Sequence, residues 1–148
     1  MRNRSKTLAT WLAVIGGSLG LHRFYLHGLK DVWGWLHPWP TLVGLVGVIR
    51  MRGLGQDDHV AWLLIPVLGV MLSIGMLSAI VIGLTPDERW VARFHPDRTQ
   101  PAAASGGTAV IGVILALLIG GGVLMGTLAF GGQKYFEYQR ELAEQRPA

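Results

Sequence analysis

Residues 16–26, GGSLGLHRFYL, decide how this chain folds, because they close an apolar run and bring a histidine, an arginine and two aromatic residues together. Small side chains that let helices approach closely occupy Gly16, Gly17, Ser18 and Gly20. In a continuous helix, Arg23 shares a face with Gly16 and Gly20, whereas Tyr25 lies roughly opposite. We therefore expect Arg23 to point toward packed helices and to pair with an acid or with helix-end carbonyls. The acids within reach are Asp31, Asp87 and Glu88; an arginine that only contacts lipid headgroups is the alternative.

The composition is that of a membrane protein. Of 148 residues, 51% are hydrophobic and 15% are charged, and the mean hydropathy is +0.40. The net charge of +4 does not indicate nucleic-acid binding, because the 13 Lys and Arg residues stand in ones and twos beside apolar runs, as the flanks of membrane helices do. The absence of cysteine excludes disulfides, thiolate metal sites and cysteine nucleophiles.

Uncharged runs predict four membrane spans, over residues 7–26, 32–49, 60–84 and 108–130. A helix needs about 20 residues to cross the ~30 Å hydrocarbon layer, and the third and fourth runs meet this length without a charge. The first run meets it only by continuing to Leu26. His37, Pro38 and Pro40 interrupt the second run, so we expect a kinked helix there, with a re-entrant segment as the alternative.

The expected fold class is therefore an all-α integral membrane protein. Residues 1–50 should form an antiparallel helical hairpin, and residues 51–148 a further helical pair. Residues 86–94 predict a short interfacial helix between spans three and four, with Thr85 and Glu88 as a capping box. The tail after residue 130 is rich in good helix formers, so the fourth helix should continue into it.

The distribution of basic residues predicts cytoplasmic termini. Four spans place both termini on one side, together with the second loop, and these segments carry 8 of the Lys and Arg residues against 5 in the other two loops. The basic start and the apolar run after it also resemble a signal peptide cleaved after Gly20. Because the apolar character continues beyond that point, we expect a retained span.

Lys6, the apolar run, Gly17, Gly20 and the sequence His22-Arg23-Phe24-Tyr25-Leu26 resemble the two-transmembrane (TM-two) domain family of small membrane proteins. The resemblance covers residues 6 to about 47. It implies a helical hairpin in a bacterial inner membrane and brings no established activity. In animal members, which are linked to signalling and protein contacts, the motif turn is thought to face the cytosol. The family usually has glycine directly after Tyr-Leu, whereas here His27 precedes Gly28.

The fourth span is rich in small residues. Gly112, Ala116 and Gly120 form one stripe, and Gly122 and Gly126 form a second. Packing within the chain, a homo-oligomer contact and a hinge all suit such stripes, with packing favoured.

Sequence patterns favour a protein without catalysis. GGSLG fits the G-x-S-x-G pattern of a hydrolase, but that elbow needs a strand-to-helix turn, and we expect Ser18 inside a continuous helix. The five histidines lack metal-ligand spacing, and the spans contain no acid that would mark an ion path. We expect no cofactor, and an accessory or regulatory role through helix packing with a membrane-protein partner or a second copy. A small oligomeric channel or transporter is the alternative.

Overall fold

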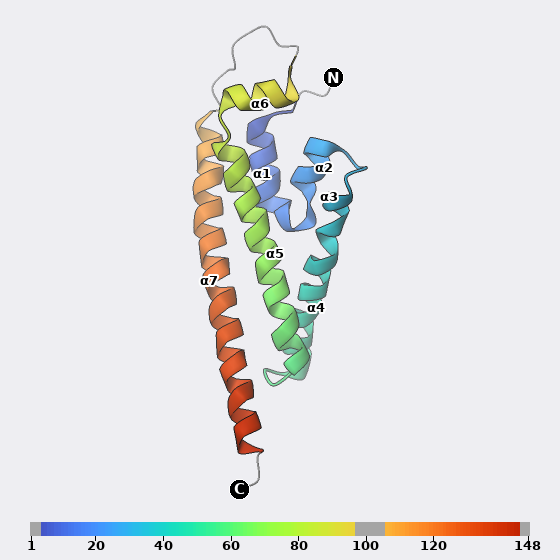
Figure 1. The fold of residues 1–148 in the computed structure, drawn as a ribbon, viewed down its shortest axis with the longest axis vertical. Coiled ribbons are helices and arrows are strands. Elements are labelled where there is room, and N and C mark those ends of the chain that lie inside the picture. The colour runs from blue at the N-terminus through green and yellow to red at the C-terminus, as the bar shows by residue number, and fades with distance from the viewer. Residues whose placement is uncertain (1–3, 97–105, 146–148) are drawn as a thin grey trace.

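The computed structural model describes residues 4–96 and 106–145, which form helices and loops with no strand among them. Figure 1 shows an elongated bundle. A 3-10 turn, η1 (Gly17–Leu19), separates the first two helices, and Asp87–Phe94 forms a short helix across one end of the bundle. In chain order the helices are α1 (Lys6–Gly16), α2 (Leu21–His27), α3 (Val32–Leu36), α4 (Pro38–Leu54), α5 (His59–Leu84), α6 (Asp87–Phe94) and α7 (Gly107–Glu144).

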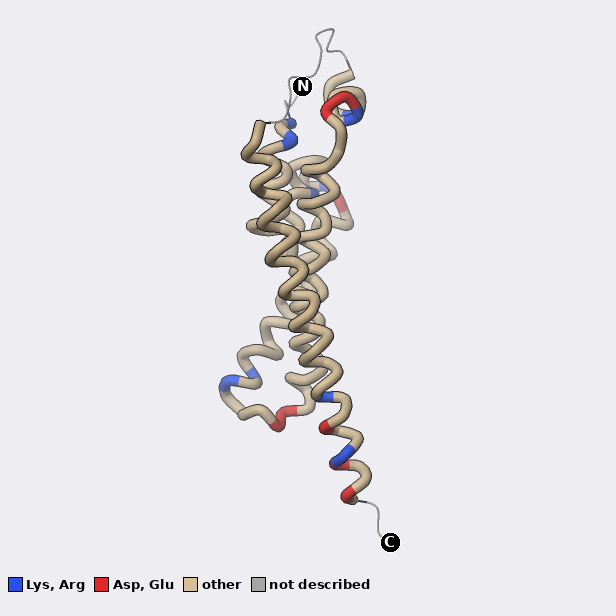
Figure 2. The backbone as a smooth tube through the Cα atoms, turned by 90° about the vertical axis from the view of Figure 1, so that its left-hand side faces the viewer, with Lys and Arg blue, Asp and Glu red and all other residues tan. Residues whose placement is uncertain are grey.

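Three helical segments are long and apolar enough to cross a membrane: Val32–Leu54, which joins α3 to α4, together with α5 and α7. They run along the long axis, and charged residues lie toward the two ends of the molecule (Figure 2). These segments contain the predicted second, third and fourth spans. The 38 residues of α7 also confirm that the fourth helix continues into the tail.

The predicted first span over residues 7–26 is wrong. Helix α1 has 11 residues, about 16 Å of helix, which is half of what a crossing needs. The chain then turns at η1 and returns in α2 toward the end from which α1 came (Figure 1). The Tyr25 hydroxyl accepts a hydrogen bond from the Ser5 backbone nitrogen, 2.8 Å away, so the start of α1 and the end of α2 lie together. Residues 6–27 thus form a short helical hairpin, and four spans are not confirmed.

Glycine explains why the helix ends here. Gly20 has φ +76°, in the left-handed region that side chains disfavour, and its N–H donates to Gly17 O at 3.0 Å. Three glycines and a serine within five residues also have low helix propensity. Gly17 meets Gly75 of α5 so closely that a Cβ on Gly17 would lie 2.6 Å from the Gly75 Cα. The reversal is therefore built where two backbones touch.

The described ends of the chain lie at opposite ends of the bundle. Arg4 accepts a hydrogen bond from the Trp90 indole nitrogen of α6, at 2.9 Å, whereas Gln145 follows α7 at the far end (Figure 1). This differs from the predicted common side for both termini. The reason is that residues 6–27 turn back toward the end of the bundle from which they start. The described residues then contain three candidate spans, and an odd number of spans puts the two ends of the chain on opposite sides.

Helix α5 is the centre of the bundle and packs against α7, α4 and α1. One core cluster joins Ala13 of α1, Met76 and Ala79 of α5, and Ala116 of α7. Residues from both predicted parts, 1–50 and 51–148, therefore share one core.

The predicted kink in the second span and the predicted short helix over residues 86–94 are found in part. His37 interrupts the helix between α3 and α4, but its backbone is helical, so this segment runs on and the reversal lies in residues 17–20 instead. Helix α6 occupies nearly the predicted range. The expected capping box is wrong, because the Thr85 hydroxyl donates to Val81 O at 2.7 Å and α6 has no side-chain cap.

Replacing Gly75 with alanine should destabilise the protein by about 1–3 kcal/mol. The new Cβ would lie 2.8 Å from the Gly17 carbonyl carbon and from the Ser18 nitrogen, and neither backbone atom can move without opening the turn. Thermal unfolding in detergent measures this effect. Gly53→Ala is the matched control, because a Cβ at Gly53 meets no atom within 4 Å. Equal melting temperatures for the two variants would contradict the packing described here.

Candidate functional site

The motif residues build the hairpin tip and the helix that follows it. The main-chain oxygens of the tip find partners inside the protein: the Thr41 hydroxyl of α4 lies 2.7 Å from Ser18 O, and Gly20 O accepts hydrogen bonds from the backbone N–H groups of Arg23 and Phe24 at 2.9 and 3.2 Å. Non-helical backbone at membrane depth persists only when its polar groups are satisfied in this way.

A second glycine contact seats α2 against α3. A Cβ on Gly20 would lie 2.6 Å from Gly34 O, and a Cβ on Gly34 would lie 2.6 Å from the Phe24 ring. The same ring packs edge-on against Trp35, with centroids 5.2 Å apart. Phe24 therefore fills the space that the glycines leave, which fixes the direction of α2.

Arg23 pairs with Asp31, one of the three acids considered from the sequence. Its Nε donates to Asp31 Oδ2 at 2.7 Å, and Nη2 lies 3.4 Å from Oδ1. The pairing is confirmed, but the reasoning that led to it is wrong, because Gly16 and Arg23 do not share one continuous helix. The ion pair instead closes the loop between α2 and α3. The guanidinium beside Asp31 holds the pKa of that carboxyl below its usual value of 3.8.

His22 is buried and faces His37. The ring centroids are 5.9 Å apart with an edge-on arrangement, and His22 is 4% exposed. Its Nδ1 has no hydrogen-bond partner among the described residues. Tyr25 holds the start of α1 through its hydrogen bond with Ser5, as described above. The extra residue His27 ends α2, and Gly28 then turns the chain at φ +88°.

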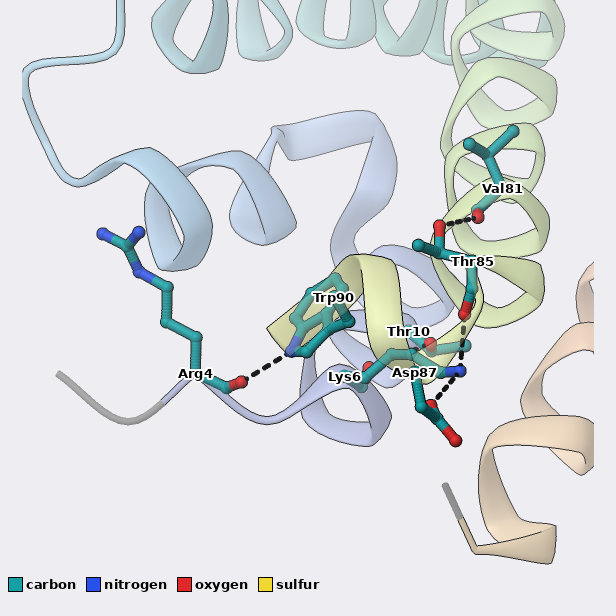
Figure 3. A network of polar contacts seen from close by, with 7 residues as sticks. All are labelled: Arg4, Lys6, Thr10, Val81, Thr85, Asp87 and Trp90. Atoms are coloured by element: carbon teal, nitrogen blue, oxygen red, sulfur yellow. Dashed lines mark hydrogen bonds and ion pairs between the residues drawn. The ribbon is translucent and has the colours of Figure 1, made fainter. Parts of the chain in front are cut away.

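Lys6 fastens α6 to the hairpin (Figure 3). Its Nζ donates to Asp87 Oδ1 at 2.6 Å and to Thr85 O at 2.7 Å, and its side chain is only 9% exposed. Trp90 completes the attachment, because its indole N–H bonds Arg4 O and its ring is 7% exposed. The packing of Trp90 with Ala9 and Leu26 makes α6 a lid over the hairpin.

A cleft lies beneath this lid. Two cavities, of about 130 and 290 Å³, have four lining residues in common and so adjoin: Leu26, His27, Val81 and Ile82. One part reaches Arg89 and Arg93 of α6, and the other reaches His22 and Arg23 of α2. The cleft thus has an apolar floor and a basic rim.

The two small-residue stripes of α7 differ. Gly112, Ala116 and Gly120 are buried, and a Cβ on Gly120 would lie 2.7 Å from the Met76 Cβ. Gly122 and Gly126 meet no atom within 4 Å. The first stripe packs within the chain, as predicted, whereas the second faces away from the described helices.

The reason given for setting aside a serine nucleophile also needs correction. Ser18 lies at a sharp turn and not within a continuous helix. The turn joins two helices, however, while a nucleophile elbow joins a strand to a helix. Among the described residues, no group of three His, Asp or Glu residues is placed to hold a metal ion.

Sequence reasoning missed three residues of this site: Thr41, Gly75 and Gly34. Gly34 and Thr41 lie beyond the end of the motif and Gly75 lies far from it in the sequence, and each contacts the motif only after folding. The spacing of small residues in α3 to α5 is a usable signal for close helix contact, but it does not say which helix is the partner.

Comparisons with family models, with curated proteins and with solved structures found no match for this chain. The TM-two resemblance therefore stays a prediction.

Removing the Asp31 carboxylate should matter at neutral pH and not in acid. Because the folded-state pKa is lowered, the ion pair stabilises the fold above the ordinary pKa of an aspartate and is lost as the pH falls through the folded-state value. Asp31→Asn should melt below the unchanged protein at pH 7, and this difference should shrink toward pH 3. Asp57→Asn is the control, since no ion pair joins Asp57 to a described residue. A difference that is constant with pH would contradict the account.

Loss of the Lys6 amine should loosen α6. We expect Lys6→Met to cost about 1.5–3 kcal/mol, the usual range for hydrogen bonds to charged groups, because the variant loses the bonds to Asp87 and Thr85 O. Melting in detergent and protease cleavage within residues 87–94 report this. Lys30→Met removes the same charge from an exposed position and should leave both unchanged. Equal behaviour of the two variants would show that Lys6 does not hold the lid.

Proposed function

We propose that this chain is a non-enzymatic protein of a bacterial inner membrane that acts as an accessory or regulatory subunit by packing its helices against a partner in the bilayer. The observation that carries the proposal is the outer face of α7. There Gly122 and Gly126 leave a helix surface with no atom within 4 Å of the place where a Cβ would stand.

Several glycines elsewhere in this bundle lie at helix contacts. A Cβ on Gly44 or Gly47 of α4 would lie within 3 Å of α5, and Gly17 and Gly120 meet α5 equally closely. Helices in a bilayer gain little from the hydrophobic effect and associate through such close approach. A bare glycine face on α7 is therefore suited to a helix from another chain.

The distribution of basic residues supports an orientation with α6 toward the cytoplasm. Among the described residues, six Lys or Arg lie in or next to α1, α2 and α6, which are at the α6 end of the bundle (Figure 1): Arg4, Lys6, Arg23, Lys30, Arg89 and Arg93. Four lie in the C-terminal parts of α4 and α7, toward the other end: Arg50, Arg52, Lys134 and Arg140. The positive-inside rule then places the N-terminal hairpin and the lid on the cytoplasmic side. The interfacial location of α6 is part of this proposal.

A small oligomeric channel is the second candidate, because the same glycine face could join copies of this chain. The cavity between α5 and α7 does not support a channel. It measures about 380 Å³ and is lined by apolar residues and one serine, Ser73. Ion paths need polar groups or water along their length.

A photo-crosslinker carried by α7 tests the proposal directly. The chain has no cysteine, so Gly126→Cys and Leu128→Cys each provide one thiol for a benzophenone maleimide. Position 128 is exposed and lies about 200° around the helix from position 126, which makes it a control at similar depth. In native membranes we expect a discrete protein adduct from position 126 and much less from position 128.

The mass of the adduct separates the candidates. A single added mass different from 16.1 kDa identifies a partner subunit, and a doubling to a dimer followed by conductance in bilayers supports the channel. Equal crosslinking from both positions, or lipid adducts alone from both, would overturn the proposed docking face.

A further inference from the structure

The cleft beneath α6 combines features that do not serve the packing of the chain. Its floor is apolar and includes Leu26, Leu77 and Val81, and the last two are about 60% exposed, so the cleft opens to the side of the bundle. Its rim carries Arg89 and Arg93, both exposed. Among the described residues, no acid lines either part of the cleft.

The two arginines of α6 are available to an anion. They lie four residues apart, on one face of the helix, and neither forms an ion pair with a described acid. Asp87 of the same helix is engaged by Lys6 (Figure 3). Arg23, at the other side of the cleft, is held by Asp31. Positive charge at the rim is therefore concentrated on α6.

The order of polarity along the cleft matches that of a phospholipid. Leu77 and Val81 lie within α5, a candidate membrane span, whereas α6 crosses the bundle end beyond that span (Figure 1). An occupant must therefore be apolar toward the middle of the membrane and anionic toward its surface. Free phosphate satisfies the rim but leaves the floor empty.

We propose that this cleft binds one anionic phospholipid, with its phosphate on Arg89 and Arg93 and one acyl chain along Leu77 and Val81 of α5. Trp90 and Phe94 of α6, which line the same part as the arginines, cover the glycerol region. The proposal depends on the membrane location of the chain and does not depend on a protein partner at α7.

Native mass spectrometry of the full chain, released from detergent, can test the site. The probes are phosphatidylglycerol and phosphatidylcholine at equal concentration. We expect one phosphatidylglycerol to be retained per chain in preference to phosphatidylcholine. Arg89→Gln with Arg93→Gln should weaken that retention about tenfold or more, since each arginine near a membrane surface contributes about one kcal/mol toward an anionic lipid. Arg52→Gln with Arg140→Gln removes the same charge at the other end and should have little effect.

Two further measurements separate a built site from general attraction to headgroups. Val81→Phe fills the floor, leaves the rim intact and alters an exposed position that the fold tolerates, so it should also reduce retention. Inorganic phosphate in excess should not displace the lipid. Equal loss in both arginine pairs, unchanged retention in Val81→Phe, or displacement by inorganic phosphate would each overturn the proposal. Melting temperatures within a few degrees of the unchanged protein establish that the variants fold.

Discussion

The contact between Gly17 and Gly75 is the constraint on which the rest of this structure depends. It lets the backbone of η1 lie directly on the middle of α5, where a Cβ on either residue would meet main-chain atoms at 2.6 to 3.0 Å. A chain that reverses at membrane depth must satisfy its own carbonyls, because lipid offers no donors. The hydroxyl of Thr41 and the N–H groups of Gly20, Arg23 and Phe24 do this. With the turn held there, α1 begins at the α6 end of the bundle and α2 ends at it.

The lid follows from that reversal. Because α1 starts at the same end as α2 finishes, Lys6 and Arg4 stand beside the first residues after α5 and can bond Thr85, Asp87 and Trp90 (Figure 3). The lid in turn closes one side of the cleft that opens between α2 and α5. One close glycine contact thus leads to an attached amphipathic helix and to a basic, apolar-floored cleft near the end of the candidate spans.

Arg23 shows where sequence reasoning succeeds and where it fails. An arginine beside an apolar run needs a partner, so electrostatics predicts that Arg23 pairs with an acid or with helix-end carbonyls, but it does not choose Asp31 among the three acids considered. The helical-wheel argument was wrong because it assumed a continuous helix through Gly20, which stands at φ +76°. The sequence does show four residues of low helix propensity, at positions 16, 17, 18 and 20. The same small residues also occur in a continuous helix that packs closely through glycine, so they do not distinguish a turn from such a helix. What decides between them is a contact with Gly75, nearly 60 residues away.

The sequence by itself determined the all-helical class, the location of three long apolar segments and the continuation of α7 beyond residue 130, because length, hydropathy and helix propensity are local properties. It also determined that Gly112, Ala116 and Gly120 face another helix. Only the tertiary structure decided that residues 6–27 turn back, that the described chain ends lie apart, and that Gly122 and Gly126 stay uncovered. These three features depend on which helices pack together. Small residues indicate that a close contact exists, but they do not identify the helix that makes it.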